Sequence, residues 1–206
     1  MAPLLVQEVA PANAAAVTNA APLILLFAEG QTRIAGQPYR QVTFVWEQPV
    51  AGRRVRGASA SWQGLRLTLN AAGQPAIWEV LRDGSGMDVF FVSQSAEAAA
   101  LRAFGPSLPG RRFAVERTIE ETPKAVVARI IDDAPVPMGP IVHLNFSGDI
   151  TTVNCRCMTT QAGQLVGQEE YGLVADPSAA APWSRPGPTS AGSRPLDQVL
   201  RLPAGF

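Results

Sequence analysis

The sequence predicts a mainly β, or α+β, fold: an antiparallel sheet or sandwich of hairpins with one or two short helices. Three observations predict it. Apolar residues alternate with polar ones in several short runs. Glycine-containing turns separate these runs between residues 65 and 93. Only one segment, residues 95–105, has both a start and a stop signal for a helix.

Residues 41–47 and 65–69 show the two-residue period of a half-buried strand most clearly. Val42, Phe44 and Trp46 share one face of the first run. In the second run, the leucines at 65, 67 and 69 lie opposite Arg66 and Thr68. Residues 76–81 and 87–93 follow across short turns, so residues 65–93 are predicted to form an antiparallel meander.

The predicted helix follows the meander directly. Ser95 is expected to cap its first free amides, and Gly105 followed by Pro106 ends it. Further strands are expected at residues 111–117, 124–131 and 169–174. The run 124–131 is nearly all apolar, which is typical of a central strand covered on both faces.

Composition divides the chain into three parts: an N-terminal segment 1–22, one β-rich domain 23–175, and a C-terminal arm 176–206 rich in proline, alanine and serine. Such a composition buries too little apolar surface to offset chain entropy. The arm from Pro177 onward is therefore expected to contribute little to the core.

Charge and length exclude some classes of partner. The 17 basic and 17 acidic residues cancel, so nucleic acid is not expected as a partner. The best apolar run, residues 22–28, is much shorter than the roughly 20 residues of a membrane span. Two cysteines are too few for a disulfide framework, which favours a soluble cytoplasmic protein, although small residues near position 15 leave export open. Abundant arginine, alanine, glycine and proline indicate a bacterial source.

Most local motifs are better explained by structure than by catalysis. Ser85 between two glycines lacks the spacing of a nucleophile elbow. The adjacent carboxylate pairs at 120–121, 132–133 and 169–170 would point to opposite faces of a strand. Glu47 and Glu79 each follow an aromatic residue within a strand, so two such strands could bring both carboxylates onto one surface of the sheet. The arginine clusters at 52–57 and 110–112 are expected to be solvated loops.

One short stretch gathers the residues best suited to chemistry. The only histidine, His143, and the only cysteines, Cys155 and Cys157, lie within residues 141–158. Sulfur and imidazole are good ligands for soft metals, so a metal- or thiol-dependent enzyme is one interpretation. The other is a β-hairpin whose cysteines are small buried hydrophobes.

The register of this hairpin decides between the two interpretations. A two-residue turn at Gly148 and Asp149 would pair Ser147 with Ile150 and His143 with Asn154. His143, Asn154 and Arg156 would then share one face. The buried face would hold the remaining apolar side chains and both thiols: Val142, Leu144, Phe146, Val153, Cys155 and Cys157.

These observations favour a non-catalytic binding or interaction module, because strands are plentiful and converging reactive groups are not. Whether the protein is an enzyme stays open. A small anionic ligand is the alternative at the face of His143, Asn154 and Arg156, where a cation, an amide and an imidazole meet. No cofactor is implied, and the expected partner is a small molecule or a protein.

Overall fold

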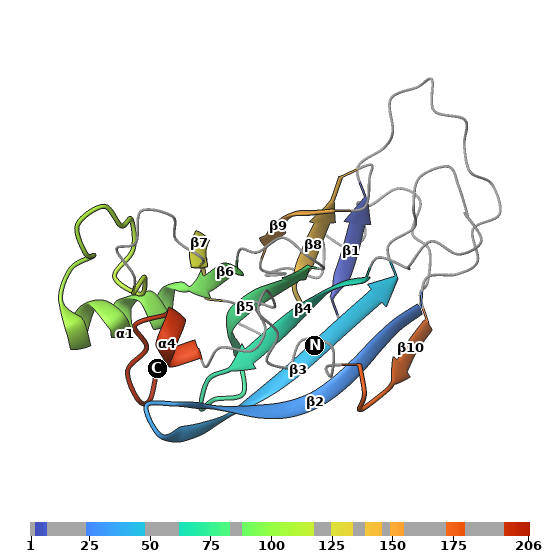
Figure 1. Cartoon of the computed structure of the whole chain (residues 1–206), viewed down its shortest axis with the longest axis horizontal. Helices are drawn as coiled ribbons and strands as arrows, with labels where there is room; N and C mark the ends of the chain where they lie inside the picture. Colours follow the sequence, from blue (N-terminus) through green and yellow to red (C-terminus); the bar gives the residue numbers. More distant parts are fainter. Residues whose placement is uncertain are drawn as a thin grey trace.

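The computed structural model describes residues 3–7, 24–47, 62–82, 88–117, 125–133, 139–145, 149–154, 172–179 and 196–206. In the described part of the chain the fold is mainly β, with two helices and mostly antiparallel strand pairs, as the sequence predicts. Its described elements form two sheets that pack face to face, and the helices lie against the larger sheet (Figure 1).

The larger sheet has seven strands among the described residues, in the order β10-β2-β3-β4-β5-β6-β7. Its five middle strands, β2 to β6, form a continuous antiparallel meander, which confirms the meander predicted for residues 65–93. Both outermost pairs, β10 with β2 and β6 with β7, are parallel. The strands are β2 (Ile24–Ile34), β3 (Gln37–Glu47), β4 (Trp62–Leu69), β5 (Pro75–Arg82), β6 (Asp88–Ser93), β7 (Ala125–Ile131) and β10 (Gly172–Ala175).

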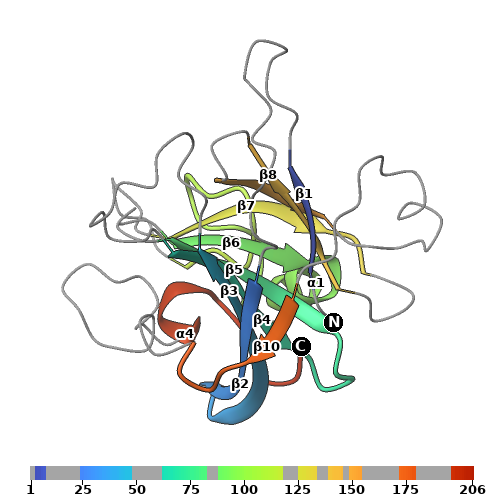
Figure 2. The same ribbon diagram turned by 90° about the vertical axis from the view of Figure 1, so that its right-hand side faces the viewer.

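The smaller sheet has three strands in the order β1-β8-β9: β1 (Leu4–Gln7), β8 (Ile141–Leu144) and β9 (Ile150–Asn154). It covers one face of the larger sheet, here called the inner face. In Figure 2, β8 and β1 lie above β7. Val42, Phe44 and Trp46 point into this interface, as their alternation predicts. The inner core also contains Leu65, Leu67, Leu69, Trp78, Val142 and Val153.

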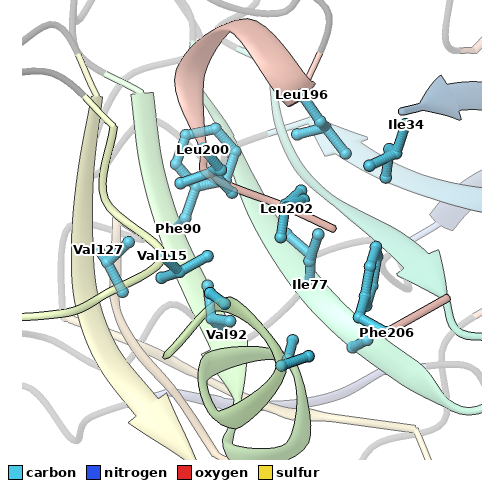
Figure 3. Close-up of a cluster of buried hydrophobic side chains, with 14 of the residues drawn as sticks. Ile34, Ile77, Phe90, Val92, Val115, Val127, Leu196, Leu200, Leu202 and Phe206 are labelled. Atoms are coloured by element: carbon cyan, nitrogen blue, oxygen red, sulfur yellow. The ribbon is translucent and has the colours of Figure 1, made fainter. Parts of the chain in front are cut away.

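The opposite face of the larger sheet, the outer face, is covered by helix α1 (Gln94–Phe104) and the C-terminal segment 196–206, which includes α4 (Leu196–Val199). Leu196 lies beside Ile34, Leu200 beside Phe90 and Leu202 beside Ile77 (Figure 3). The prediction that the arm contributes little to the core is therefore wrong for residues 196–206. Their apolar side chains are numerous enough to be driven into the core, whatever the composition of the residues before them.

Helix α1 begins two residues earlier than its predicted cap implies. Ser93, not Ser95, is the N-cap, and its side chain accepts a hydrogen bond from the amide of Ala96. Ser95 instead donates to Asp133 at 2.9 Å. Gly105 ends the helix with φ of 78°, as predicted, because a residue without Cβ adopts this conformation at little cost.

Two strand predictions after α1 are corrected. Residues 111–117 form turns with a single bridge to Leu200, because the carboxylates of Glu97 and Glu116 accept their backbone amide hydrogens in place of a neighbouring strand. The run predicted as a central strand is β7, which lies at one end of the larger sheet. Arg129 in β7 is exposed, whereas a strand covered on both faces would bury it.

Candidate functional site

The hairpin of β8 and β9 forms with a register different from the predicted one. His143 pairs with Thr152 and Leu144 pairs with Ile150, with an irregularity between these two pairs. The predicted pairings of Ser147 with Ile150 and of His143 with Asn154 are therefore wrong. Ile150 also moves to the buried face, where its side chain is 2% exposed.

Two hydrogen bonds between Asn145 and Asp149, one of them to a side chain, explain the shift. The backbone amide of Asn145 donates to the carbonyl of Asp149 at 2.9 Å, and the amide of Asp149 donates to the Asn145 side chain at 2.9 Å. These two bonds join Asn145 directly to Asp149, and the irregularity in β9 brings Ile150 opposite Leu144. Val142, Leu144 and Val153 keep the buried face that the apolar pattern predicts for them.

His143 and Asn154 lie on the other face of the hairpin and contact each other. They are diagonal neighbours in the register, and the Asn154 Nδ2 atom lies 2.9 Å from His143 Nε2. Arg129 from β7 reaches the same place: its Nη2 donates to Asn154 Oδ1 and, at 3.3 Å, to the carbonyl of Val153. The cluster of Arg129, Asn154 and His143 thus joins the edge of the larger sheet to the hairpin of the smaller one.

Donor and acceptor rules fix the orientation of these groups. Arg129 has only donors, so Asn154 must present its Oδ1 oxygen to the guanidinium and its Nδ2 amide to His143. In this orientation the Asn154 amide faces His143 Nε2, which accepts in the tautomer that carries its proton on Nδ1. Nε and Nη1 of Arg129 and Nδ1 of His143 have no protein partner in the described part of the chain. The site therefore offers unused donors beside a positive charge.

Only two of the three predicted ligand-binding residues can be compared with this geometry. His143 and Asn154 are brought together, whereas Arg156, Cys155 and Cys157 lie outside the described residues. The positively charged side chain that lies beside His143 and Asn154 is Arg129, which sequence reasoning missed. Arg129 is the one charged residue in the apolar run 125–131, which is the sequence feature that could have marked it. Its contact with β9 could not be predicted, because that contact depends on how the two sheets pack.

A second polar cluster lies on the outer face of the larger sheet. Arg66 in β4 donates from Nη1 to Glu79 Oε2 in β5 at 3.2 Å and from Nε to the Thr43 hydroxyl at 3.4 Å. All three side chains are buried. Burial raises the pKa of Glu79, and the charge and hydrogen bond of Arg66 oppose that rise. The charges are already matched, which is typical of a structural pair.

The remaining sequence candidates do not converge. Glu47 is exposed at the end of β3, and its pairing with Trp62 puts it four residues along β4 from the strand position that faces Glu79. Asp133 accepts the Ser95 hydroxyl, and Arg112 lies 5.2 Å from the ring centre of Phe113. Other candidates lie outside the described residues: Ser85, the pairs 120–121 and 169–170, and the cluster 52–57.

The described residues contain neither a metal-ligand cluster nor a membrane-spanning helix. Within the described ranges, no group of three or more histidine, cysteine or acidic side chains is arranged to hold a metal ion. No helix in the described part of the chain is both long enough and apolar enough to cross a bilayer.

Comparisons with protein-family models, with curated proteins and with solved structures found no match.

Proposed function

We propose that this protein is a non-catalytic binding module that holds an anionic group at the cluster of Arg129, Asn154 and His143. The observation that supports it best is the state of Arg129: its guanidinium is exposed and, among the described residues, has no carboxylate partner. Its one anchored nitrogen, Nη2, holds it beside two half-buried polar side chains.

The geometry favours a small or singly charged anion. Arginine can bind a carboxylate with two donors at once, either Nη1 with Nη2 or Nε with Nη2. Both arrangements need Nη2, which is already bound to Asn154 and Val153. An incoming oxyanion would therefore meet single donors, Nη1 or Nε of Arg129 and Nδ1 of His143. A carboxylate of a small molecule or of a protein side chain has the size and charge for this arrangement.

The setting proposed for this function is the bacterial cytoplasm. Two cysteines give no disulfide framework, and the arginine-rich composition is typical of GC-rich bacterial coding. A small molecule or a protein is the proposed partner. Balanced charge, with 17 basic and 17 acidic residues, supports it over nucleic acid.

Titration with acetate and inorganic phosphate, followed by NMR of the His143 and Arg129 side chains, tests the proposal. Saturable shifts at these two residues are expected, and Arg129→Gln should weaken binding about tenfold or more by removing the charge-assisted donors. Arg33→Gln is the matched control, because Arg33 is an exposed arginine whose described contact is the carbonyl of Gly36. Equal anion affinity in both variants would exclude this site.

A further inference from the structure

The last turn of α1 exposes two large apolar side chains. Leu101 is 51% exposed and Phe104 is 44% exposed. They are three residues apart in the helix, so they lie on the same side of it. The other large apolar side chains that are exposed in the described part of the chain, Ile24, Leu173 and Val174, belong to the distant β2 and β10 edge. The end of α1 is therefore a separate apolar patch.

Two arginines, Arg102 and Arg201, lie beside this patch. Arg201 lies over the Phe104 ring, 5.3 Å from its centre, and donates to the carbonyls of Phe104 at 2.5 Å and Pro106 at 3.2 Å. Arg102 is exposed beside Leu101. Neither arginine forms an ion pair with any carboxylate among the described residues. These backbone contacts fix Arg201 in place without neutralising it.

Two of the acidic side chains of this region, Glu97 and Glu116, already accept hydrogen bonds from backbone amides. Glu97 accepts from Ala114 and Val115, and Glu116 accepts from the two residues before them. Segments 94–117 and 196–206 together contain five arginines and three acidic side chains, whereas the whole chain has 17 of each charge. These two segments therefore carry two more arginines than acidic side chains, although the chain as a whole is balanced.

We propose that the last turn of α1, with Leu101, Arg102, Phe104 and Arg201, is a docking surface for an acidic peptide segment of a partner protein. Charge complementarity requires an acidic occupant, and Leu101 and Phe104 require that the segment also carry apolar side chains. A nucleic acid matches the charge but makes little use of Leu101. One face of the Phe104 ring is also covered by Arg201 and is closed to base stacking.

Fluorescence anisotropy of a short labelled peptide rich in glutamate and leucine tests this surface. Leu101→Ser and Arg102→Gln should each weaken binding about tenfold, the first by removing apolar contact and the second by removing charge. Leu173→Ser and Arg33→Gln are the matched controls, because they make the same changes at exposed positions outside α1. Thermal unfolding of each variant verifies the fold.

Three results would overturn the proposal. The first is equal peptide affinity in the wild type, Leu101→Ser and Arg102→Gln. In the second, a peptide of glutamate and serine binds as tightly as the leucine-containing one, which would leave the apolar residues without a role. In the third, single-stranded DNA binds more tightly than the peptide. Acetate binding and its loss in Arg129→Gln are measured separately from peptide binding, so failure here is distinguishable from failure of the proposed anion site.

Discussion

Arg66 and Glu79 form a buried ion pair across β4 and β5, with 3.2 Å between Arg66 Nη1 and Glu79 Oε2. The pair lies on the outer face of the sheet between two apolar clusters, one centred on Phe90 and Ile77, the other containing Val45 and Leu81. Removing two charges from water is costly, and their attraction offsets that cost only while both partners are present.

Removing one partner should destabilise the protein more than removing both. Arg66→Met or Glu79→Leu alone leaves a buried charge uncompensated and should cost roughly 3–5 kcal/mol. The double variant replaces the pair with apolar side chains of similar size and should lie within about 1–2 kcal/mol of the wild type. Urea unfolding gives these free energies.

The coupling between the two variants is the decisive quantity in this cycle. Arg40→Met and Glu29→Leu provide the control, because Arg40 and Glu29 form an exposed ion pair with 3.6 Å between charged atoms. That pair should couple by at most about 1 kcal/mol. Additive effects at Arg66 and Glu79 would mean that the buried pair does not behave as a unit.

Stability should depend on pH through Glu79. Its pKa is raised by burial above the ordinary value of 4.5, so the folded protein binds a proton more readily than the unfolded chain. The stabilisation from this group is fully present below that ordinary value and is lost as pH rises through the raised pKa. Arg66→Met removes the opposing charge and should raise the pKa of Glu79 further.

The measurement is the free energy of unfolding against pH for Arg66→Met and for the double variant Arg66→Met with Glu79→Gln. Above the ordinary Glu79 pKa, the single variant should lose stability faster, by at most about 1.4 kcal/mol per pH unit. Glutamine removes the titration but keeps the shape. Parallel curves for the two proteins would show that Glu79 does not titrate differently on folding.

Gly64 in β4 should not tolerate a side chain. A Cβ atom at this position would meet the carbonyl oxygen of Phe44 at 2.3 Å and a side-chain carbon of Val45 at 2.8 Å. Because the closest atom belongs to the backbone of β3, the strands would have to separate, and Gly64→Ala should cost roughly 1–3 kcal/mol. Gly30→Ala in β2 is the matched control, since a Cβ atom on Gly30 would have no such neighbour within 4 Å. Similar melting temperatures for both variants would contradict this account.

Local patterns predicted the strands well because burial on the inner face follows the period of two. Val42, Phe44 and Trp46 alternate in sequence and lie together in the inner core. The same pattern could not show that the outer face is also covered. Arg66 and Thr68 look like solvent-facing residues in the sequence, yet both are buried. The charge of Arg66 is matched by Glu79, 13 positions away, and the Thr68 hydroxyl accepts a hydrogen bond from Gln41.

The candidate site was only partly predictable for a related reason. The apolar pattern of the hairpin puts His143 on the face opposite Val142, but a side-chain hydrogen bond between Asn145 and Asp149 changes the register. Arg129 reaches Asn154 across two sheets. No pattern within one strand contains that contact, because it depends on packing between elements.

The C-terminal segment supplies the last prediction, because it reverses the expectation drawn from composition. Leu200 is 1% exposed and packs in the outer core, while the backbone amide of Arg201 donates to the carbonyl of Val115 at 2.7 Å. Leu200→Ala should cost about 2–5 kcal/mol by leaving a cavity. Leu173→Ala, at a site that is 46% exposed, should change stability by about 0.5 kcal/mol or less.

Truncation before Leu196 extends the same test to the whole segment. It removes Leu196, Leu200 and Leu202 together and exposes the sheet residues that they cover, so the melting temperature should fall more than in Leu200→Ala. Tyr39 would also lose its stacked contact with Phe206, whose ring centre lies 4.8 Å from its own. An unchanged cooperative transition after truncation would show that the arm is dispensable for stability. Packing of α1 alone would then be enough to stabilise the outer face of the larger sheet.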